Sequence, residues 1–172
     1  MHNVRYDYSS VHVDVPTPLA GEIVDWGRKH VTDDDIYVTQ RDPTFGREDE
    51  IHITILYGLH AEQPDVVREL LQKHGPVKVR LGKVGVFTNP FKFDVVMIEA
   101  VSDELKILNE TLTQNVRHTN KYGVYRPHVT IAYVKKGKGW QFNKWNIWEG
   151  REFTCDYAVF SSKNGFKEKI IF

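Results

Sequence analysis

Several features that mark common protein classes are absent from this sequence. Cys155 is its one cysteine, so no internal disulfide can form and a reducing compartment is favoured over secretion. The 23 basic residues balance the 23 acidic ones, which argues against a stable nucleic-acid complex and confines any phosphate recognition to a local site. No apolar run reaches membrane-spanning length, and the polar residues 1–10 do not read as a signal peptide. We therefore expect a cytoplasmic protein without membrane contact.

Signatures of several catalytic sites are also missing. Gly75 and Gly82-Lys83 have the wrong spacing for a phosphate-binding P-loop, and no Ser or Thr follows the lysine. There is no Gly-x-Ser-x-Gly nucleophile elbow. Zinc sites need ligands at short spacings, and most histidines have no Cys or His partner nearby. We therefore expect no metal and no cofactor. The scattered histidines are His2, His12, His30, His60, His74 and His118.

One seven-residue stretch occurs twice. Ile51–Tyr57 reads IHITILY and Pro127–Tyr133 reads PHVTIAY, with His, Thr, Ile and Tyr at matching positions. Both stretches are rich in β-branched and aromatic residues and contain no glycine, which predicts two buried strands. A single His-x-Thr triplet arises readily by chance, but two in matched strands indicate a shared role.

Each of these strands is predicted to have one polar and one apolar face. Because residues i and i+2 of a strand point to the same side, His52 and Thr54 project together, as do His128 and Thr130. The opposite faces are predicted to pack under helices, and they carry Ile51, Ile53, Ile55, Tyr57, Pro127, Val129, Ile131 and Tyr133.

Two imidazoles and two hydroxyls suit the hydrolysis of a phosphodiester. One group must remove a proton from the nucleophile and another must protonate the leaving oxygen, and a histidine pKa of about 6.5 allows both. Threonine hydroxyls can donate hydrogen bonds to the non-bridging oxygens where negative charge develops. We expect His52 and His128 to be the acid and base, in an order that the sequence leaves open, and Thr54 and Thr130 to contact the phosphate.

The paired motifs resemble those of the 2H phosphoesterase superfamily, which is named for two His-x-Thr motifs. The resemblance implies a two-lobed, pseudo-twofold α+β fold, with antiparallel sheets lining a central cleft, helices outside and a metal-independent phosphodiesterase site. The GVFTNP segment at residues 85–90 is similar to one in bacterial RNA 2′,3′-cyclic phosphodiesterases, which are 2′-5′ RNA ligase-like (LigT-like) proteins. The compact size, the acidic loop and Tyr-Gly-Leu-His after the first motif also resemble phage anti-CBASS phosphodiesterases, which degrade cyclic oligonucleotide signals.

The remaining patterns predict one domain over residues 1–172. In the first predicted helix, Thr17 is expected as the N-cap and Pro18 at the first helical position. In the second, Pro64 is expected at the first position and Gly75 just after the end. Ser102 is expected as the N-cap of the third. A glycine bend is expected at Gly82 or Gly85. Predicted strands cover 11–15, 51–57, 77–87, 91–101, 127–133, 151–162 and 166–172, helices cover 17–30, 64–74 and 102–116, and the loop 31–50 contains a short strand at 36–38.

Candidate substrate contacts flank the motif strands. For base stacking we favour Phe87, at the end of a hairpin strand, and then Tyr8 and Phe91, although each residue also has a structural interpretation. Basic residues around the second motif strand fit either a phosphate contact or a solvated basic loop. These are Arg126, Lys135, Lys136 and Lys138.

The sequence thus predicts a metal-independent phosphodiesterase acting on a small nucleotide. A cyclic di- or trinucleotide signal is preferred over a 2′,3′-cyclic phosphate or 2′-5′ linkage of RNA. A nucleotide- or RNA-binding module without turnover is the rival from another class, and it has no need of an acid/base pair. If a phage encodes the chain, the location would be the host cytoplasm. His12 and Asp14 share a polar strand face, which we interpret as solvated rather than as a metal pair.

Overall fold

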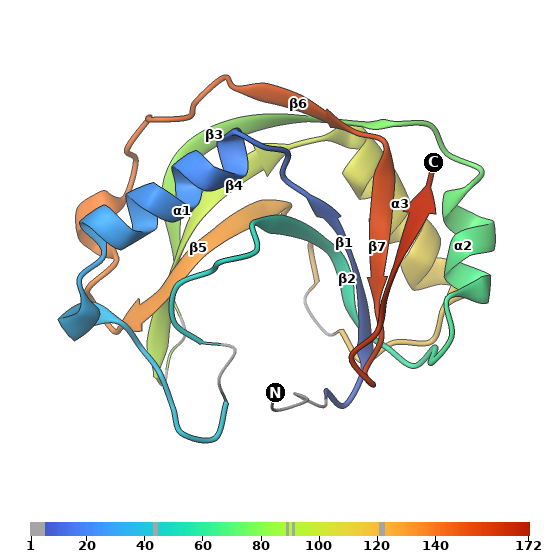
Figure 1. Cartoon of the computed structure of the whole chain (residues 1–172), viewed down its shortest axis with the longest axis horizontal. Coiled ribbons are helices and arrows are strands. Elements are labelled where there is room, and N and C mark those ends of the chain that lie inside the picture. Colours follow the sequence, from blue (N-terminus) through green and yellow to red (C-terminus); the bar gives the residue numbers. More distant parts are fainter. Residues whose placement is uncertain (1–5, 43–44, 89, 91, 121–122) are drawn as a thin grey trace.

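An antiparallel sheet of eight strands, curled into a deep arch, forms the centre of the computed structural model (Figure 1). The structure describes residues 6–42, 45–88, 90, 92–120 and 123–172. The strand order is β6-β3-β4-β5-β2-β1-β7-β8. The strands are β1 Ser9–Asp14, β2 His52–Leu59, β3 Val77–Thr88, β4 Phe93–Val101, β5 His128–Lys135, β6 Glu152–Cys155, β7 Tyr157–Ser161 and β8 Lys167–Ile171.

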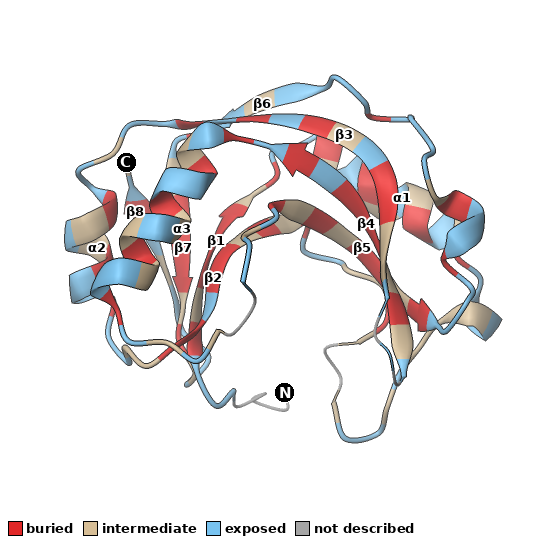
Figure 2. Cartoon of the chain, turned by 180° about the vertical axis from the view of Figure 1, so that it is seen from behind, coloured by how far each residue is buried: buried red, intermediate tan, exposed pale blue. Residues whose placement is uncertain are grey.

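The helices α1 (Leu19–His30), α2 (Asp65–Leu71) and α3 (Asp103–Asn115) lie on the convex side of the sheet (Figures 1 and 2). Buried residues follow the surface between these helices and the strands, which places the core there (Figure 2). This architecture confirms the predicted α+β class with helices outside. The predicted sheets are two halves of one curled sheet.

The two motif strands, β2 and β5, are neighbours at the middle of the sheet. They pair at Ile53 and Val129 and then diverge. We call the half formed by β2, β1, β7 and β8 the first lobe, and the half formed by β5, β4, β3 and β6 the second lobe. Both central residues are fully buried, because their side chains point into the core on the convex side.

Close packing of helices fixes the backs of both motif strands. In α3, Asn109 donates from Nδ2 to the carbonyl of Ile55 at 2.8 Å. In α1, a Cβ at Gly27 would lie 3.1 Å from Cγ2 of Ile131, so the glycine allows this helix to approach β5 closely. Each lobe therefore holds its motif strand from behind and leaves the concave side open to other side chains.

One predicted strand, at residues 151–162, is in fact two. The chain turns at Asp156, so that β6 pairs with β3 and β7 pairs with β1. In the strand order β6 is the first strand and β7 is the last but one, so the segment passes from the outer edge of the second lobe to the outer part of the first. The predicted hairpin around residues 163–165 is confirmed as β7 and β8. The local sequence pattern shows that residues 151–162 are extended, but it does not show that the first and second parts pair with different strands.

Three helix starts were predicted with different success. Ser102 caps α3, since its side chain accepts a hydrogen bond from the backbone N–H of Leu105 at 3.1 Å. Thr17 is not a cap, because α1 begins at Leu19 with Pro18 in the cap position. Pro64 likewise occupies the cap position of α2 rather than its first turn. Prolines thus precede both helices, one position earlier than expected.

Other boundaries also shifted. The helix α2 ends at Leu71, before the predicted closing residue Gly75. The predicted short strand at 36–38 is reduced to a single bridge between Ile36 and Val134. A register shift between Leu81 and Val84 places the expected glycine bend at Gly82. No helix in the described ranges is long and apolar enough to span a bilayer.

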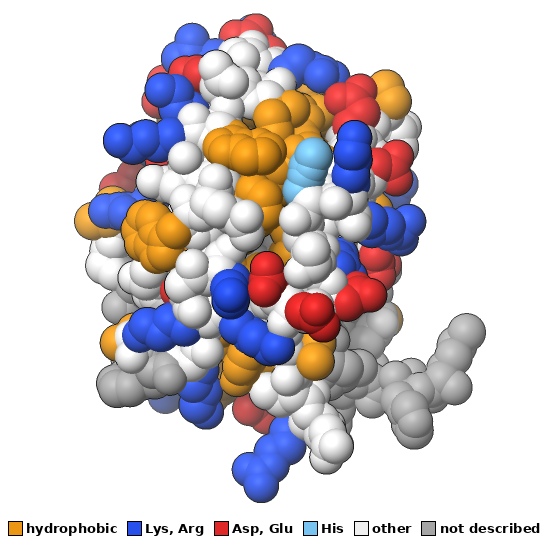
Figure 3. All heavy atoms as spheres, turned by 90° about the vertical axis from the view of Figure 1, so that its left-hand side faces the viewer, with side chains coloured by type: hydrophobic (Ala, Val, Ile, Leu, Met, Phe, Trp, Pro, Cys, Tyr) orange, Lys and Arg blue, Asp and Glu red, His pale blue; other side chains and the backbone are white. Residues whose placement is uncertain are grey.

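The outer surface where α1 ends carries an aromatic cluster. Trp26 packs edge-on against His30, Phe142 and Trp145, at centroid distances between 4.8 and 5.8 Å. Figure 3 views this side of the molecule and shows hydrophobic side chains gathered beside a histidine. Nearby Trp140, in the short 3₁₀ helix Trp140–Phe142, is 50% exposed.

Candidate active site

The first motif strand contains a β-bulge directly after its threonine. In the pairing of β2 with β1, Thr54 lies opposite His12 and Leu56 lies opposite Val11, so Ile55 is an extra residue. The extra residue reverses the alternation of faces beyond it. The residues before it, His52 and Thr54 among them, keep the expected alternation.

The second motif strand has the same bulge at the same place. In the pairing of β5 with β4, Thr130 lies opposite Met97 and Ala132 lies opposite Val96, which leaves Ile131 as the extra residue. Both bulges therefore follow the threonine of a His-x-Thr motif. The pseudo-twofold relation between the lobes extends to this local irregularity.

The bulges overturn the prediction that Tyr57 and Tyr133 face the helices. Beyond the bulge, Tyr57 pairs with Ser10 and Tyr133 pairs with Val95, on the concave face. Tyr57 is accordingly 44% exposed. An uninterrupted alternation, on which the prediction rested, would have buried both rings. The concave face of each motif strand thus carries His, Thr and Tyr.

Both motif histidines are held by the backbone in the same way. Nδ1 of His52 lies 2.7 Å from the carbonyl oxygen of Glu50, and Nδ1 of His128 lies 2.8 Å from that of Arg126. Because a carbonyl oxygen only accepts hydrogen bonds, Nδ1 carries the proton in each case. In the neutral ring, Nε2 then has a lone pair for taking up a proton, and in the charged ring it has a proton to give.

The two imidazoles are close enough to influence each other electrostatically. Their strands pair at the residue that follows each histidine. Burial lowers the pKa of His128; the hydrogen bond to the Arg126 carbonyl partly offsets this, and positive charge on His52 lowers it further. The two rings therefore resist being charged together.

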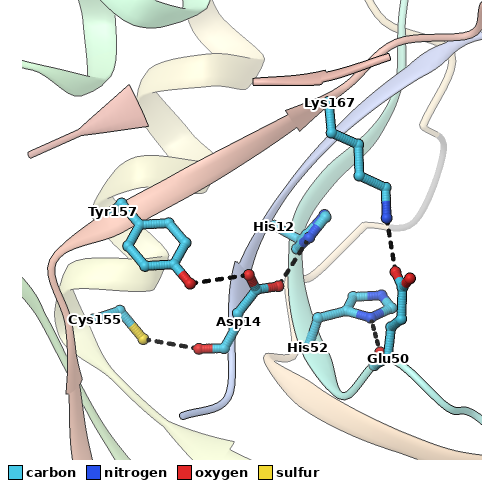
Figure 4. A network of polar contacts seen from close by, with 7 residues as sticks. All are labelled: His12, Asp14, Glu50, His52, Cys155, Tyr157 and Lys167. Carbon is cyan, nitrogen blue, oxygen red and sulfur yellow. Dashed lines mark hydrogen bonds and ion pairs between the residues drawn. The ribbon is translucent and has the colours of Figure 1, made fainter. Parts of the chain in front are cut away.

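A third histidine, His12, lies beside the first motif (Figure 4). Its ring centroid is 4.8 Å from that of His52, and its Nε2 is 3.2 Å from Oδ1 of Asp14. The other carboxylate oxygen of Asp14 accepts a hydrogen bond from the Tyr157 hydroxyl at 3.1 Å. Burial first, and then the charge of His52, lower the pKa of His12 to about 4. His12 is 9% exposed, so the predicted solvated strand face is wrong for His12, whereas the side chain of Asp14 is 39% exposed.

Sequence reasoning missed His12 as part of this site. The alternating His12-x-Asp14 on a strand was visible, but only the pairing of β1 with β2 brings it against His52. Among the residues that the structure describes, no group of three or more His, Cys, Asp or Glu side chains could hold a metal ion.

Carboxylates complete the polar surroundings of the first motif. Lys167 donates to the side chain of Glu50 at 2.7 Å, and this hydrogen bond lowers the pKa of Glu50 (Figure 4). Burial raises the pKa of Glu48, while positive charge on His52 acts in the opposite direction. Glu48 and a charged His52 therefore attract each other.

Apolar groups surround the second motif instead. Phe87, predicted as a substrate contact, packs edge-on against His128 with centroids 4.8 Å apart and planes at 90°. Met97 lies opposite Thr130, where the first lobe has His12 opposite Thr54. Phe87 thus covers one side of the imidazole, in agreement with the burial that lowers its pKa.

The other predicted contacts are spread more widely. Tyr8 stacks on His60 in the first lobe, with centroids 4.9 Å apart, and Phe91 lies outside the described residues. Arg126 is exposed beside His128. The ammonium groups of three predicted residues bind protein oxygens: Lys135 the Asp34 carbonyl, Lys136 the Pro90 carbonyl and Lys138 the Asp35 carboxylate.

Each motif strand is also lined by the loop that leads into the other motif strand. The loop before β2 bridges to β5 through Ile36 to Val134 and Arg47 to Ala132. The loop before β5 contacts β2, where the Tyr125 hydroxyl donates to the carbonyl of Thr54 at 2.8 Å. This reciprocal crossing holds the two motif strands together where they diverge.

Comparison with known proteins gives a family and a fold. The model of the 2′-5′ RNA ligase superfamily matches residues 16–162. No curated protein matches the chain. Among solved structures, TT0787 of Thermus thermophilus has a TM-score of 0.63 at 16% identity, covering 95% of this chain and 94% of that one.

Two further structures were determined with nucleotides. Usb1 of Kluyveromyces marxianus with uridine monophosphate has a TM-score of 0.61 at 10% identity, with 96% of this chain and 98% of that chain covered. Escherichia coli LigT with NADP+ has a TM-score of 0.58 at 14% identity, with 96% and 94% covered. At these identities the likeness concerns the fold.

Proposed function

The chain belongs to the 2′-5′ RNA ligase superfamily of 2H phosphoesterases and is a phosphodiesterase, and on this basis we propose that it cleaves small nucleotides without a metal. The observation that carries the proposal is the matched pair of histidines on adjacent strands, each with Nδ1 bound to a backbone carbonyl. Both Nε2 atoms are thereby left for proton transfer at one phosphate. A module that only binds nucleotides would not need this arrangement.

In the proposed reaction, His128 is the base and His52 is the acid. The lowered pKa of His128 keeps its ring neutral, so Nε2 can take the proton of the attacking oxygen. His52, at the equivalent position on the other motif strand, would then be the acid, and its Nε2 gives a proton to the leaving oxygen. The bond from phosphorus to the leaving oxygen breaks as the bond to the attacking oxygen forms.

Thr54 and Thr130 would bind the phosphate between the two rings. Each lies two residues beyond a motif histidine on the same face of its strand, before the bulge. Their hydroxyls can donate to the two non-bridging oxygens, where negative charge grows in the transition state. The two lobes would thus supply one histidine and one threonine each.

The substrate we favour is a cyclic di- or trinucleotide, and the alternative is a 2′,3′-cyclic phosphate or 2′-5′ linkage of RNA. Uridine monophosphate with Usb1 and 3′-AMP with LigT support a nucleotide at this type of fold. The family name favours the RNA alternative.

A substrate panel tests the proposal. Cyclic dinucleotides, cyclic trinucleotides and 2′,3′-cyclic mononucleotides are incubated with the protein in EDTA, and the products are separated by chromatography. We expect at least one phosphodiester to be cleaved in EDTA by the wild type and not by the matched His128→Gln variant. Equal cleavage by both proteins, or activity that EDTA abolishes and zinc or magnesium restores, would overturn it.

A further inference from the structure

Tyr57 and Tyr133 occupy equivalent positions on the concave face, on opposite sides of the two motif histidines. The residues paired with the threonine and with the tyrosine are two positions apart on the neighbouring strand. In the first lobe they are His12 and Ser10, and the spacing in the second lobe is the same. Each tyrosine therefore lies about 7 Å along its strand from the motif threonine. Because β2 and β5 are antiparallel, the two tyrosines lie in opposite directions from the point where the strands pair.

An aromatic pocket adjoins Tyr133 in the second lobe. The Tyr133 ring contacts Phe45 and Phe93, with centroids 5.1 and 5.6 Å away. Phe45, Phe93 and Tyr37 line a pocket of about 450 Å³. The polar residues of its lining are Thr39, Asp42, Arg41 and Lys92, so two cations accompany one carboxylate. Rings with neighbouring cations are what a nucleobase and its phosphate require.

The first lobe presents Tyr57 in a more open setting. Its partner on β1 is Ser10, whose small side chain leaves the tyrosine 44% exposed. At the end of the same strand, Tyr8 stacks on His60 and is 42% exposed. Aromatic surface therefore flanks the motif histidines on both sides, enclosed in the second lobe and open in the first.

We propose that these are two nucleobase sites, so that the preferred substrate carries a nucleoside on each side of the phosphate that is cleaved. The inference rests on the proposed function, because it takes the phosphate to lie between His52 and His128. A dinucleotide linkage or a cyclic dinucleotide fills both sites. A 2′,3′-cyclic mononucleotide has one nucleoside and leaves one site empty.

The experiment compares substrates with one and two nucleosides. Adenylyl-adenosine with a 3′-5′ linkage, the same compound with a 2′-5′ linkage, and cyclic di-AMP are compared with 2′,3′-cyclic AMP. The variants are Phe45→Ala for the enclosed site and Tyr57→Ala for the open one. Trp140→Ala, which removes a half-exposed ring of the outer surface, is the matched control.

We expect the wild type to have a higher kcat/KM for at least one two-nucleoside substrate than for 2′,3′-cyclic AMP. Each site variant should lower kcat/KM for that substrate about 10-fold, in line with the loss of one stacked base, and Trp140→Ala should not change it. The affinity of the wild type and variants for adenylyl-adenosine is measured in parallel by calorimetry.

The outcomes separate the two proposals. Cleavage of 2′,3′-cyclic AMP alone, or losses in the site variants no larger than in Trp140→Ala, would overturn the two-site inference and leave the phosphodiesterase intact. No turnover with any phosphodiester would overturn the proposed function. Calorimetry would still decide the base sites in that case, because they predict weaker binding of adenylyl-adenosine by both site variants.

Discussion

The two motif histidines have the same geometry and different surroundings. Each binds a backbone carbonyl through Nδ1, at 2.7 or 2.8 Å, and each has another ring 4.8 Å from its own. Beside His52 that ring is His12, which is bound to Asp14. Beside His128 it is Phe87. The backbone repeats between the lobes, whereas the charges do not.

This difference teaches how a nearly symmetric scaffold can perform an unsymmetric reaction. Proton transfer to and from one phosphate needs two imidazoles in equivalent positions but in opposite protonation states. Repeated strands supply the positions. The burial that lowers the pKa of His128 supplies a reason for the states to differ, without any change in the path of the backbone.

Removing either imidazole should have the largest effect on activity. We expect His52→Ala and His128→Ala each to lower kcat by roughly 10²-fold or more, since each loses one proton-transfer partner. The double variant should be hardly slower than either single one, because the two rings act as one unit. Steady-state kinetics on the cleaved substrate measures this, with thermal melts as a check of folding. Wild-type turnover in either variant would show that the histidine replaced in it is not needed for proton transfer.

Replacing His12 should sharpen the electrostatic side of the comparison. The pKa of His12 is about 4 in the folded chain against an ordinary 6.5, so the unfolded chain binds more protons between these values. The stability that neutral His12 contributes is therefore present above pH 6.5 and is lost as the pH falls toward 4, by about 3 kcal/mol at most.

The variant His12→Phe makes the first lobe resemble the second and should remove most of this pH dependence. Urea unfolding of the wild type and the variant at pH 7.5 and 4.5 gives the four free energies required. If both proteins lose the same stability between the two pH values, His12 is not the group responsible.

The threonines should give a smaller and more symmetric effect. Thr54→Val and Thr130→Val keep the shape of the side chain and remove the hydroxyl that would donate to the phosphate. We expect each to lower kcat about 10-fold with little change in melting temperature. Measured kinetics that differ widely between the two variants would show that the lobes bind the phosphate unequally.

The smallest expected effect is a shift in the pH dependence of kcat/KM when the phenyl ring beside His128 is removed. Burial lowers the pKa of His128, so Phe87→Ala, which admits water, should raise that pKa toward its ordinary value. A base with a higher pKa is protonated at higher pH, and the acidic limb of kcat/KM should move upward. Activity near pH 5.5 should fall a few-fold and activity near pH 8 should hardly change. Phe166, between β7 and β8, is 41% exposed and serves as the control. A limb that moves down, or that moves equally in Phe166→Ala, would contradict the assignment of His128 as base.

The motif strands and their chemistry could be predicted from the sequence because they depend on local order. A strand places residues i and i+2 on one face whatever its neighbours, so His52 with Thr54 and His128 with Thr130 followed directly. The cap at Ser102 is equally local.

The other features of the fold and the site depend on which strands pair with each other, and no local sequence pattern identifies those pairs. A bulge exists only relative to the opposite strand, so the concave positions of Tyr57 and Tyr133 were hidden. His12 became part of the site only through the pairing of β1 with β2. The turn at Asp156 divides one extended stretch into β6, which pairs with β3, and β7, which pairs with β1, and no local pattern identifies either partner.

The crossing of the chain between lobes has a consequence for how the protein is assembled. The first lobe combines β1 and β2 with β7 and β8, while the second is formed from the strands between them. The loops before β2 and β5 also contact the motif strand of the other half. The second lobe is thus one stretch of the polypeptide, whereas the first combines two distant segments, so its sheet cannot close until both ends of the chain meet, which should slow folding. During synthesis β1 must wait for β7, nearly 150 residues later (from Ser9 to Tyr157), before the sheet beside it is complete.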